Sequence, residues 1–190
     1  MYRPVPPLPL ALLAVAGGVL LVARLPWLLR GAGVLLLWPA LLWQPARPVQ
    51  GEFEVLALDV GQGSALLVRT AGHSLLYDAG PRYGPDSDAG QRVVVPVLRA
   101  MGESPSTVVI SHRDSDHAGG AVAVRSAWPQ VRWLSSYAVD PAERCAAGQS
   151  WEWEGVRFEM LHPTPDLIRP DGSGALPTNA MSCVLRIDNG

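Results

Sequence analysis

Hydrophobic positions form two uninterrupted runs near the N-terminus and shorter runs after residue 50. The long runs are Leu8–Ala23 and Gly31–Trp43, and the loop between them carries Arg24 and Arg30. A helix that spans a bilayer core of roughly 30 Å needs about 20 apolar residues, so each run is short for this purpose. The pattern predicts one or two short transmembrane segments.

This patterning divides the chain into three parts. Residues 1–44 are predicted to form the hydrophobic membrane segment, 45–50 a stiff proline-containing linker, and 51–190 a soluble domain. An alternative for the first part is a secretory signal peptide, since Arg3 precedes an apolar core. The second apolar run and the absence of a clear small-residue cleavage site favour the membrane segment.

The soluble part predicts strands in succession and then strands that alternate with helices. Such an order is typical of a layered α/β fold, with a mixed sheet packed on at least one helix. The predicted strands cover 53–59, 64–69, 74–78, 107–111, 131–135, 156–161 and 183–187, and the predicted helices cover 93–101 and 118–128.

Charge is distributed unevenly along the chain. Residues 1–50 contain four Arg and no acidic residue, whereas residues 51–190 contain the other 11 Arg and all 17 Asp and Glu, a formal charge of −6. An acidic domain cannot hold nucleic acid by counterion release alone. A polyanionic substrate would therefore require bound metal or a basic partner to offset the repulsion.

The charge pattern also predicts an orientation for the membrane segment. Arg24 and Arg30 favour a cytoplasmic loop by the positive-inside bias, which places the soluble domain outside the membrane. Disulfides persist in that compartment. We therefore expect Cys145 and Cys183 to form a disulfide, with two unlinked buried thiols as the alternative.

The stretch from Ser111 to Gly120 carries the candidate chemistry. It places His112, Asp114, Asp116 and His117 in the pattern H-x-D-x-D-H, between an apolar strand and a predicted helix. Nitrogen and oxygen ligands so close together suit divalent ions such as Zn²⁺ or Mn²⁺, which can generate a nucleophile from water. Asp116 is also the candidate catalytic residue. The alternative is a solvated turn in which Asp116 caps the following helix.

At these residues the sequence resembles the metallo-β-lactamase superfamily, whose usual signature is H-x-H-x-D-H. Asp114 stands where the middle His is usual, which points to the C-terminal domain of ComEC-type competence proteins, the channel proteins of bacterial DNA uptake. The resemblance covers most of 51–190 and extends to the stretches Leu58–Ser64, Tyr77–Gly80, Trp153–Phe158, Leu161–Pro163 and Asn179–Leu185.

The resemblance implies an αββα sandwich with a metal site at one edge, holding up to two divalent ions. It implies a hydrolase, specifically a nuclease that acts on incoming DNA at the outer side of the bacterial inner membrane. The family's bridging Asp and a further His would follow Gly190, so the domain is expected to be incomplete at its C-terminus, with an uncovered sheet edge or face. We therefore expect these 190 residues alone to be a poor catalyst.

Four further residues are candidates for the site. Asp78 matches a superfamily position near the metal and is expected to hydrogen-bond to the ligands rather than bind the ion. Asp59 and Gln62 flank a Gly-x-Gly turn, where they either hydrogen-bond into the site or belong to a plain hairpin turn. His162 lies at a strand end where the superfamily often has a third His ligand, and a solvent-facing His is the alternative.

Two other functions remain open at this point. The domain could be a hydrolase of the same superfamily that acts on a small ester, lactam or phosphodiester. It could also be a degenerate domain that binds DNA or a partner without turnover. Asp114 and the hydrophobic segment favour the nuclease.

Overall fold

The computed structural model describes residues 5–169 and 174–190. The chain folds into two compact units. The first comprises the residues through Ala46 together with Ala100–Gly102, and the second comprises Arg47–Arg99 and Glu103–Gly190. The candidate chemistry lies in the second unit.

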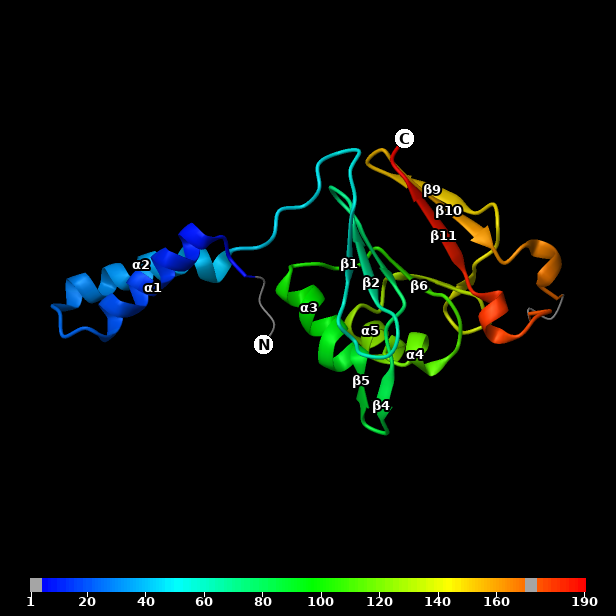
Figure 1. Cartoon of the computed structure of the whole chain (residues 1–190), viewed down its shortest axis with the longest axis horizontal. Helices are drawn as coiled ribbons and strands as arrows, with labels where there is room; N and C mark the ends of the chain where they lie inside the picture. Colours follow the sequence, from blue (N-terminus) through cyan, green and yellow to red (C-terminus); the bar gives the residue numbers. More distant parts are fainter. Residues whose placement is uncertain (1–4, 170–173) are drawn as a thin grey trace. The chain divides into compact units, whose positions relative to one another are not determined.

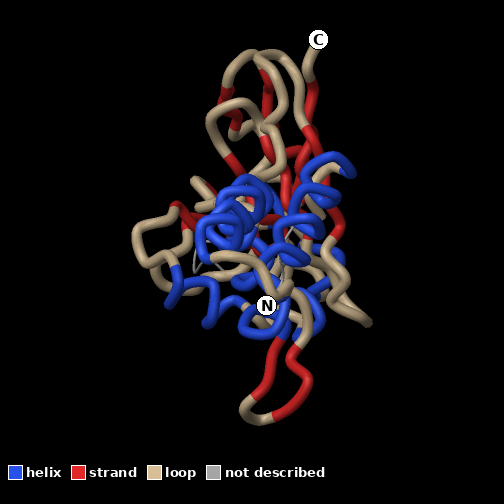
Figure 2. Tube along the Cα trace, turned by 90° about the vertical axis from the view of Figure 1, so that its left-hand side faces the viewer, coloured by secondary structure: helices blue, strands red, loops and turns tan. Residues whose placement is uncertain are grey.

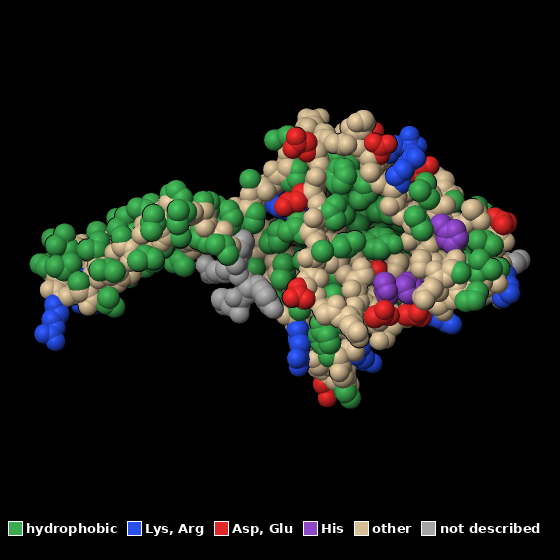
Figure 3. All heavy atoms as spheres, in the orientation of Figure 1, with side chains coloured by type: hydrophobic (Ala, Val, Ile, Leu, Met, Phe, Trp, Pro, Cys, Tyr) green, Lys and Arg blue, Asp and Glu red, His purple; other side chains and the backbone are tan. Residues whose placement is uncertain are grey.

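The first unit contains an antiparallel pair of helices, α1 (Leu8–Val22) and α2 (Trp27–Leu42). Pro26 precedes α2, which fits the preference for proline at helix starts. Gly17 and Gly33 let the two backbones approach closely, because a Cβ added to Gly17 would lie 2.6 Å from the Gly33 carbonyl oxygen. Figure 3 shows this pair covered by hydrophobic side chains, many of which are exposed.

The expectation of transmembrane segments is not supported. The two helices contain 15 and 16 residues. Within the part of the chain that the structure describes, no helix combines the length and the apolar character needed to cross a membrane.

The second unit is built on a six-stranded mixed sheet with the strand order β1-β2-β3-β6-β7-β8 (Figure 1). β1, β2 and β3 pair antiparallel as successive hairpins, and β3, β6, β7 and β8 pair in parallel. The bounds are β1 (Glu54–Ala57), β2 (Leu66–Arg69), β3 (Ser74–Tyr77), β6 (Thr107–Ile110), β7 (Arg132–Ser135) and β8 (Glu143–Arg144).

A three-stranded antiparallel sheet, in the order β11-β10-β9, packs on one face of the six-stranded sheet. Its strands are β9 (Ser150–Trp153), β10 (Val156–His162) and β11 (Val184–Asp188). The core between the sheets consists of alternate residues from both, as the two-residue period of strands requires. It contains Val68, Leu75, Val109, Leu134, Cys145, Val156, Phe158, Met160 and Cys183.

Short helices lie on the other face of the large sheet. Leu67, Leu76 and Val108 of the large sheet are also fully buried. These helices are the π-helical turn η1 (Gly90–Val94), α3 (Val95–Ala100), α4 (Ser115–Ala118) and α5 (Ala121–Ala127). Helices, large sheet and small sheet make three layers of the expected αββα sandwich. In the described residues β11 is an edge strand of the small sheet.

The structure differs from the sequence expectations in several elements. The loop after residue 78 contains a hairpin, β4 (Arg82–Gly84) and β5 (Ser87–Asp88), which projects from the domain in both views (Figures 1 and 2). The helix expected over 118–128 is two helices, of which α4 begins earlier and includes Asp116 and His117. The expectations also missed β9, although its alternating Ser-Trp-Glu-Trp pattern is typical of a strand.

A disulfide links Cys145, which follows β8, to Cys183, which precedes β11, with a Cα–Cα separation of 6.0 Å. Both residues are fully buried in the core between the sheets. The Tyr77 hydroxyl also donates a hydrogen bond to the Cys183 carbonyl oxygen. The small sheet is thus tied to the large one both covalently and through the end of β3.

Candidate metal centre

The candidate site forms where two neighbouring parallel strands end. β3 and β6 pair in parallel, and the Asp78 amide donates to the Val109 carbonyl oxygen at 2.8 Å. Because parallel strands end at the same edge of a sheet, Asp78 lies beside Ser111 and His112 although more than 30 residues separate them in sequence. The pairing of β3 with β6 therefore adds Asp78 to the residues of the H-x-D-x-D-H stretch.

His112, Asp116 and His117 form the cluster that can hold a metal ion. One possible ligand atom from each of the three lies within 4.8 Å of the others. The two imidazole rings are 4.0 Å apart between centroids. His112 is buried, His117 is half-buried and Asp116 is exposed, so the cluster opens to solvent on its acidic side. Figure 3 shows histidine and acidic side chains gathered on this face.

The two imidazoles are oriented by protein groups on the Nδ1 side. The Nδ1 atom of His117 lies 2.7 Å from Asp78 Oδ2, and that of His112 lies 2.9 Å from Ser111 Oγ and 3.2 Å from Ser182 Oγ. Hydrogen bonds of this kind fix the tautomer and the ring orientation of metal-binding histidines. They leave both Nε2 atoms available as ligands.

The Nε2 atoms face the carboxylates of the same loop. His117 Nε2 is 3.4 Å from Asp116 Oδ2, and His112 Nε2 is 3.6 Å from Asp114 Oδ2. Asp114 thus borders the cluster without belonging to the group of three. Two imidazole nitrogens and a carboxylate form a donor set that fits Zn²⁺ or Mn²⁺, with room for a fourth ligand.

The alternative of a capped polar turn does not describe this loop. The residue before α4 is Asp114, and its side chain makes no capping hydrogen bond. Asp116 lies inside the helix as its second residue. Its side chain is therefore free to take part in the cluster.

Asp78 is nearly completely buried and contacts the cluster through His117. Its Oδ1 accepts the Ser111 amide at 2.7 Å, and its Oδ2 accepts the Ser111 hydroxyl at 2.9 Å in addition to its contact with His117. Burial raises the pKa of the Asp78 carboxyl, while its hydrogen bonds to His117 and Ser111 act in the opposite direction. Asp78 has the backbone angle φ 62°, a strained value for a residue with a side chain that is typical of functional sites.

Backbone contacts hold α4 in place. Ser64 and Ala79 donate their amides to the carbonyl oxygens of Asp116 and His117, at 3.1 and 2.8 Å. A Cβ on Gly63 would overlap the Asp116 carbonyl, and one on Gly120 would overlap the Ala79 carbonyl. These glycines permit the close approach that fixes the ligands.

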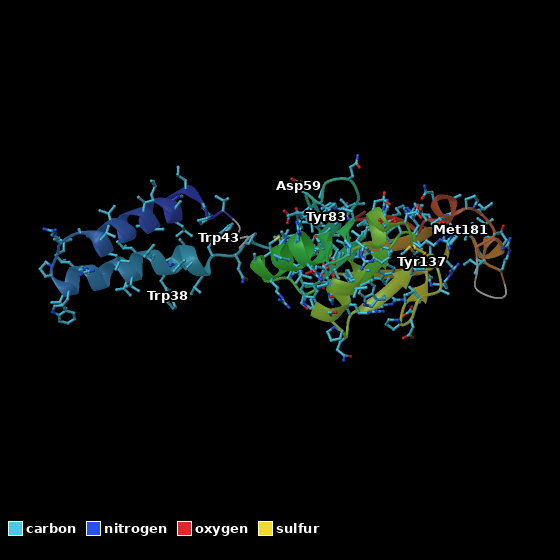
Figure 4. All side chains as sticks on the ribbon, turned by 90° about the horizontal axis from the view of Figure 1, so that it is seen from below. Trp38, Trp43, Asp59, Tyr83, Tyr137 and Met181 are labelled. Atoms are coloured by element: carbon cyan, nitrogen blue, oxygen red, sulfur yellow. A yellow bond between two sulfur atoms is a disulfide. The ribbon has the colours of Figure 1, made fainter. Side chains whose placement is uncertain are left out.

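The turn around Gly61–Gly63 therefore serves the site through its backbone and not through its flanking side chains. Asp59 and Gln62 are both exposed. Among the hydrogen bonds of the described residues, none joins either side chain to the cluster. Figure 4 labels Asp59 near Tyr83, whose hydroxyl donates to the Val60 carbonyl oxygen at 2.8 Å.

His162 lies outside the cluster of three. Its Nδ1 donates to the Ser182 carbonyl oxygen at 2.9 Å, while the Ser182 hydroxyl contacts His112. Ser182 thus connects the two histidines. Sequence reasoning missed Ser111 and Ser182 as partners of His112, although both lie in stretches that carry the family resemblance.

The cluster lies at one end of a pocket of about 410 Å³ between the large sheet and β11. Asp78, Ser111, His112, His117 and Ser182 line the polar end. Apolar side chains of β1, β2 and β11 line the rest. A concave site with apolar walls and a few convergent polar groups is the usual form of a small-molecule or active site.

The fold and this site place the chain in a known class. A model of the metallo-beta-lactamase superfamily matches residues 58–178, and the chain belongs to that superfamily. The chain is 38% identical over 187 residues to competence protein ComA of Neisseria gonorrhoeae, covering 95% of this chain and 25% of that protein. It is 34% identical over 142 residues to recombination protein 2 of Haemophilus influenzae, covering 73% of this chain and 17% of that protein.

The chain therefore spans a quarter or less of the length of these relatives. Their names agree with the resemblance to competence proteins found in the sequence. Among solved structures, a metallo-beta-lactamase with the HARLDQ motif from Cronobacter sakazakii is 22% identical, with a TM-score of 0.45 over 61% of this chain and 50% of that one.

Changing Asp78 to alanine is expected to weaken divalent-metal binding by about 10- to 100-fold, the usual cost of losing a carboxylate that orients a ligating histidine. The reason is that His117 loses the partner that fixes its ring. Titration of the purified chain with Mn²⁺ and Zn²⁺ measures the effect. Asp166→Ala, at an exposed carboxylate in the turn η2 (Pro165–Leu167), is the control. Equal affinities in both variants would show that Asp78 does not support the ligands.

Proposed function

We propose that this domain is a metal-dependent nuclease that hydrolyses phosphodiester bonds of DNA during its uptake into bacteria. The observation that carries the proposal is the convergence of His112, Asp116 and His117 with both Nδ1 atoms engaged by protein groups. A divalent ion held there would lower the pKa of water and stabilise negative charge on a phosphoryl oxygen.

The chain's own residues have separate roles in this proposal. His112 and His117 present Nε2 in fixed orientations, so little reorganisation is required when a metal binds. Asp116 is exposed beside them and supplies an anionic oxygen that can bind the ion or accept a proton. Asp78 and Ser111 hold the imidazoles from the buried side.

One observation supports DNA as the substrate class, and the charge of the domain limits how DNA can be held. The names of two relatives refer to competence and to recombination. The residues from 51 onward carry a formal charge of −6, so a few well-placed arginines or a bound metal must supply the attraction for DNA. We propose Mn²⁺ or Zn²⁺ as the metal, held by these residues.

We also propose that the domain works at the outer side of the bacterial inner membrane. The buried Cys145–Cys183 disulfide supports an oxidising compartment. The exposed apolar side chains of α1 and α2 support attachment to a hydrophobic environment.

The test is cleavage of a labelled single-stranded oligonucleotide with the purified 190-residue chain in excess, so that one slow turnover is detectable. We expect slow cleavage with Mn²⁺ or Zn²⁺ and none after EDTA treatment. Restoring the metal should restore cleavage. Nitrocefin, a thioester and bis-p-nitrophenyl phosphate are assayed in parallel. Preferential turnover of the lactam or thioester over the oligonucleotide would refute the nuclease.

A further inference from the structure

A second pocket, of about 370 Å³, flanks the metal loop on the side of the 3₁₀ turn η3 (Thr178–Met181). It shares no lining residue with the pocket between the sheets. Figure 4 labels Tyr137 and Met181, which approach this pocket from the segment after β7 and from η3. Its walls combine one cation, hydroxyl groups and apolar surface: Arg113, Ser136, Tyr137, Leu176, Thr178 and Met181.

Arg113 is the cation of this pocket and lies in the metal loop between His112 and Asp114. Its side chain is exposed, and its Nε donates to Thr178 Oγ1 at 3.1 Å. None of the ion pairs found within 5–169 and 174–190 includes Arg113. The Thr178 contact engages Nε, and among the described residues no hydrogen bond engages the terminal nitrogens of Arg113. A planar pair of donors is suited to bidentate binding of a phosphate.

The pocket is connected to the metal cluster by hydrogen bonds. Ser182, directly after η3, donates a hydrogen bond to the Asn179 carbonyl oxygen at 2.8 Å and accepts one from His112 Nδ1 at 3.2 Å. The wall that carries Thr178 and the imidazole of His112 are thus fixed relative to each other. A ligand in this pocket would lie beside whatever the metal cluster holds.

Tyr137 contributes both a hydroxyl donor and an aromatic ring to the lining of this pocket. Burial raises the pKa of its hydroxyl, and the negative charge of Asp78 raises it further. The hydroxyl is therefore protonated at neutral pH and can donate. Leu176 and Pro177 add exposed apolar surface to the same pocket.

We propose that this pocket binds one nucleotide of a DNA strand next to the scissile phosphodiester, with its phosphate on Arg113 and its base against Tyr137 and Leu176. The proposal rests on the proposed nuclease function and names the residues that position its substrate. Stacking of a base on an aromatic side chain tolerates any sequence, so the pocket would hold a strand without base specificity. In an acidic domain, an Arg that forms no ion pair among the described residues would supply a large part of the attraction for the strand.

The test compares Arg113→Gln with Arg125→Gln in the full chain. The control removes the same charge from α5, where Arg125 Nη1 donates to the Asp140 carbonyl oxygen at 2.8 Å. Binding of a fluorescent oligothymidylate is measured by anisotropy in EDTA at several salt concentrations. We expect Arg113→Gln to weaken binding about tenfold, as for loss of a charged hydrogen bond. The slope of log K against log salt should fall by about 0.7, the value for one phosphate contact to a single strand.

Arg125→Gln should leave both quantities at their wild-type values. A second measurement compares thymidine 5′-monophosphate with inorganic phosphate as competitors, and Tyr137→Ala should weaken only the nucleotide. Equal affinities and salt slopes in the two arginine variants, or no saturable oligonucleotide binding by the wild type, would overturn this pocket. Because these assays contain no metal, they are independent of whether the chain cleaves DNA. Failure of the nuclease and failure of the pocket are thus distinguishable.

Discussion

Replacing His112 or Asp116 with alanine is expected to reduce metal-dependent DNA cleavage by at least about 100-fold, more than loss of a residue that only orients a ligand. The two side chains belong to the group of three whose donor atoms converge within 4.8 Å. Removing one leaves two ligands, too few to retain a divalent ion at micromolar concentrations. Metal titration and single-turnover cleavage measure the two consequences separately.

The neighbouring candidates provide the controls for this result. Asp114 borders the cluster and His162 lies outside it, so Asp114→Ala and His162→Ala should cost less than the changes at His112 or Asp116. Asp166→Ala should have no effect. A His162→Ala variant as impaired as His112→Ala would show that the ion is held on the Ser182 side of the cluster instead.

Replacing Cys145 and Cys183 together with alanine is expected to lower the free energy of unfolding by about 4 kcal/mol, the chain-entropy value for a loop of this length. The sequence separation is 38 residues, and both side chains are fully buried between the sheets. Denaturant unfolding of the second unit, followed by tryptophan fluorescence, measures the change. Reduction of the wild-type chain should produce a similar loss.

The disulfide should also affect the site, because the Cys183 amide donates to the Ser111 carbonyl oxygen at 2.9 Å. We expect the double variant to bind metal more weakly even under conditions where it is folded. Full alkylation of both thiols in unreduced protein isolated from cells would contradict the bridge. It would also contradict the proposed location outside the cytoplasm.

The local pattern of hydrophobic and polar residues was sufficient to predict helices, strands and the ligand loop, because these depend on residues close together in sequence. The apolar runs near the N-terminus predicted helices close to α1 and α2, and alternating apolar residues predicted most strands within two residues. The density of His and Asp between 112 and 117 indicated a ligand loop. The pattern did not predict the β4–β5 hairpin, because a Gly/Pro/Asp-rich segment carries no hydrophobic period. It also led to the expectation of transmembrane segments, which the described helices do not support.

The sequence by itself determined the class of fold and the loop that carries the ligands, because both depend on residue type and short-range spacing. Only the tertiary structure decided which donors converge. It included His112, Asp116 and His117, left Asp114 at the border, and excluded His162, Asp59 and Gln62. It also brought Asp78, which follows β3, to His117, and Ser182, which comes shortly before β11, to His112. The physical reason is that strand pairing and sheet packing set these distances, and neither is encoded in the spacing of residues along the chain.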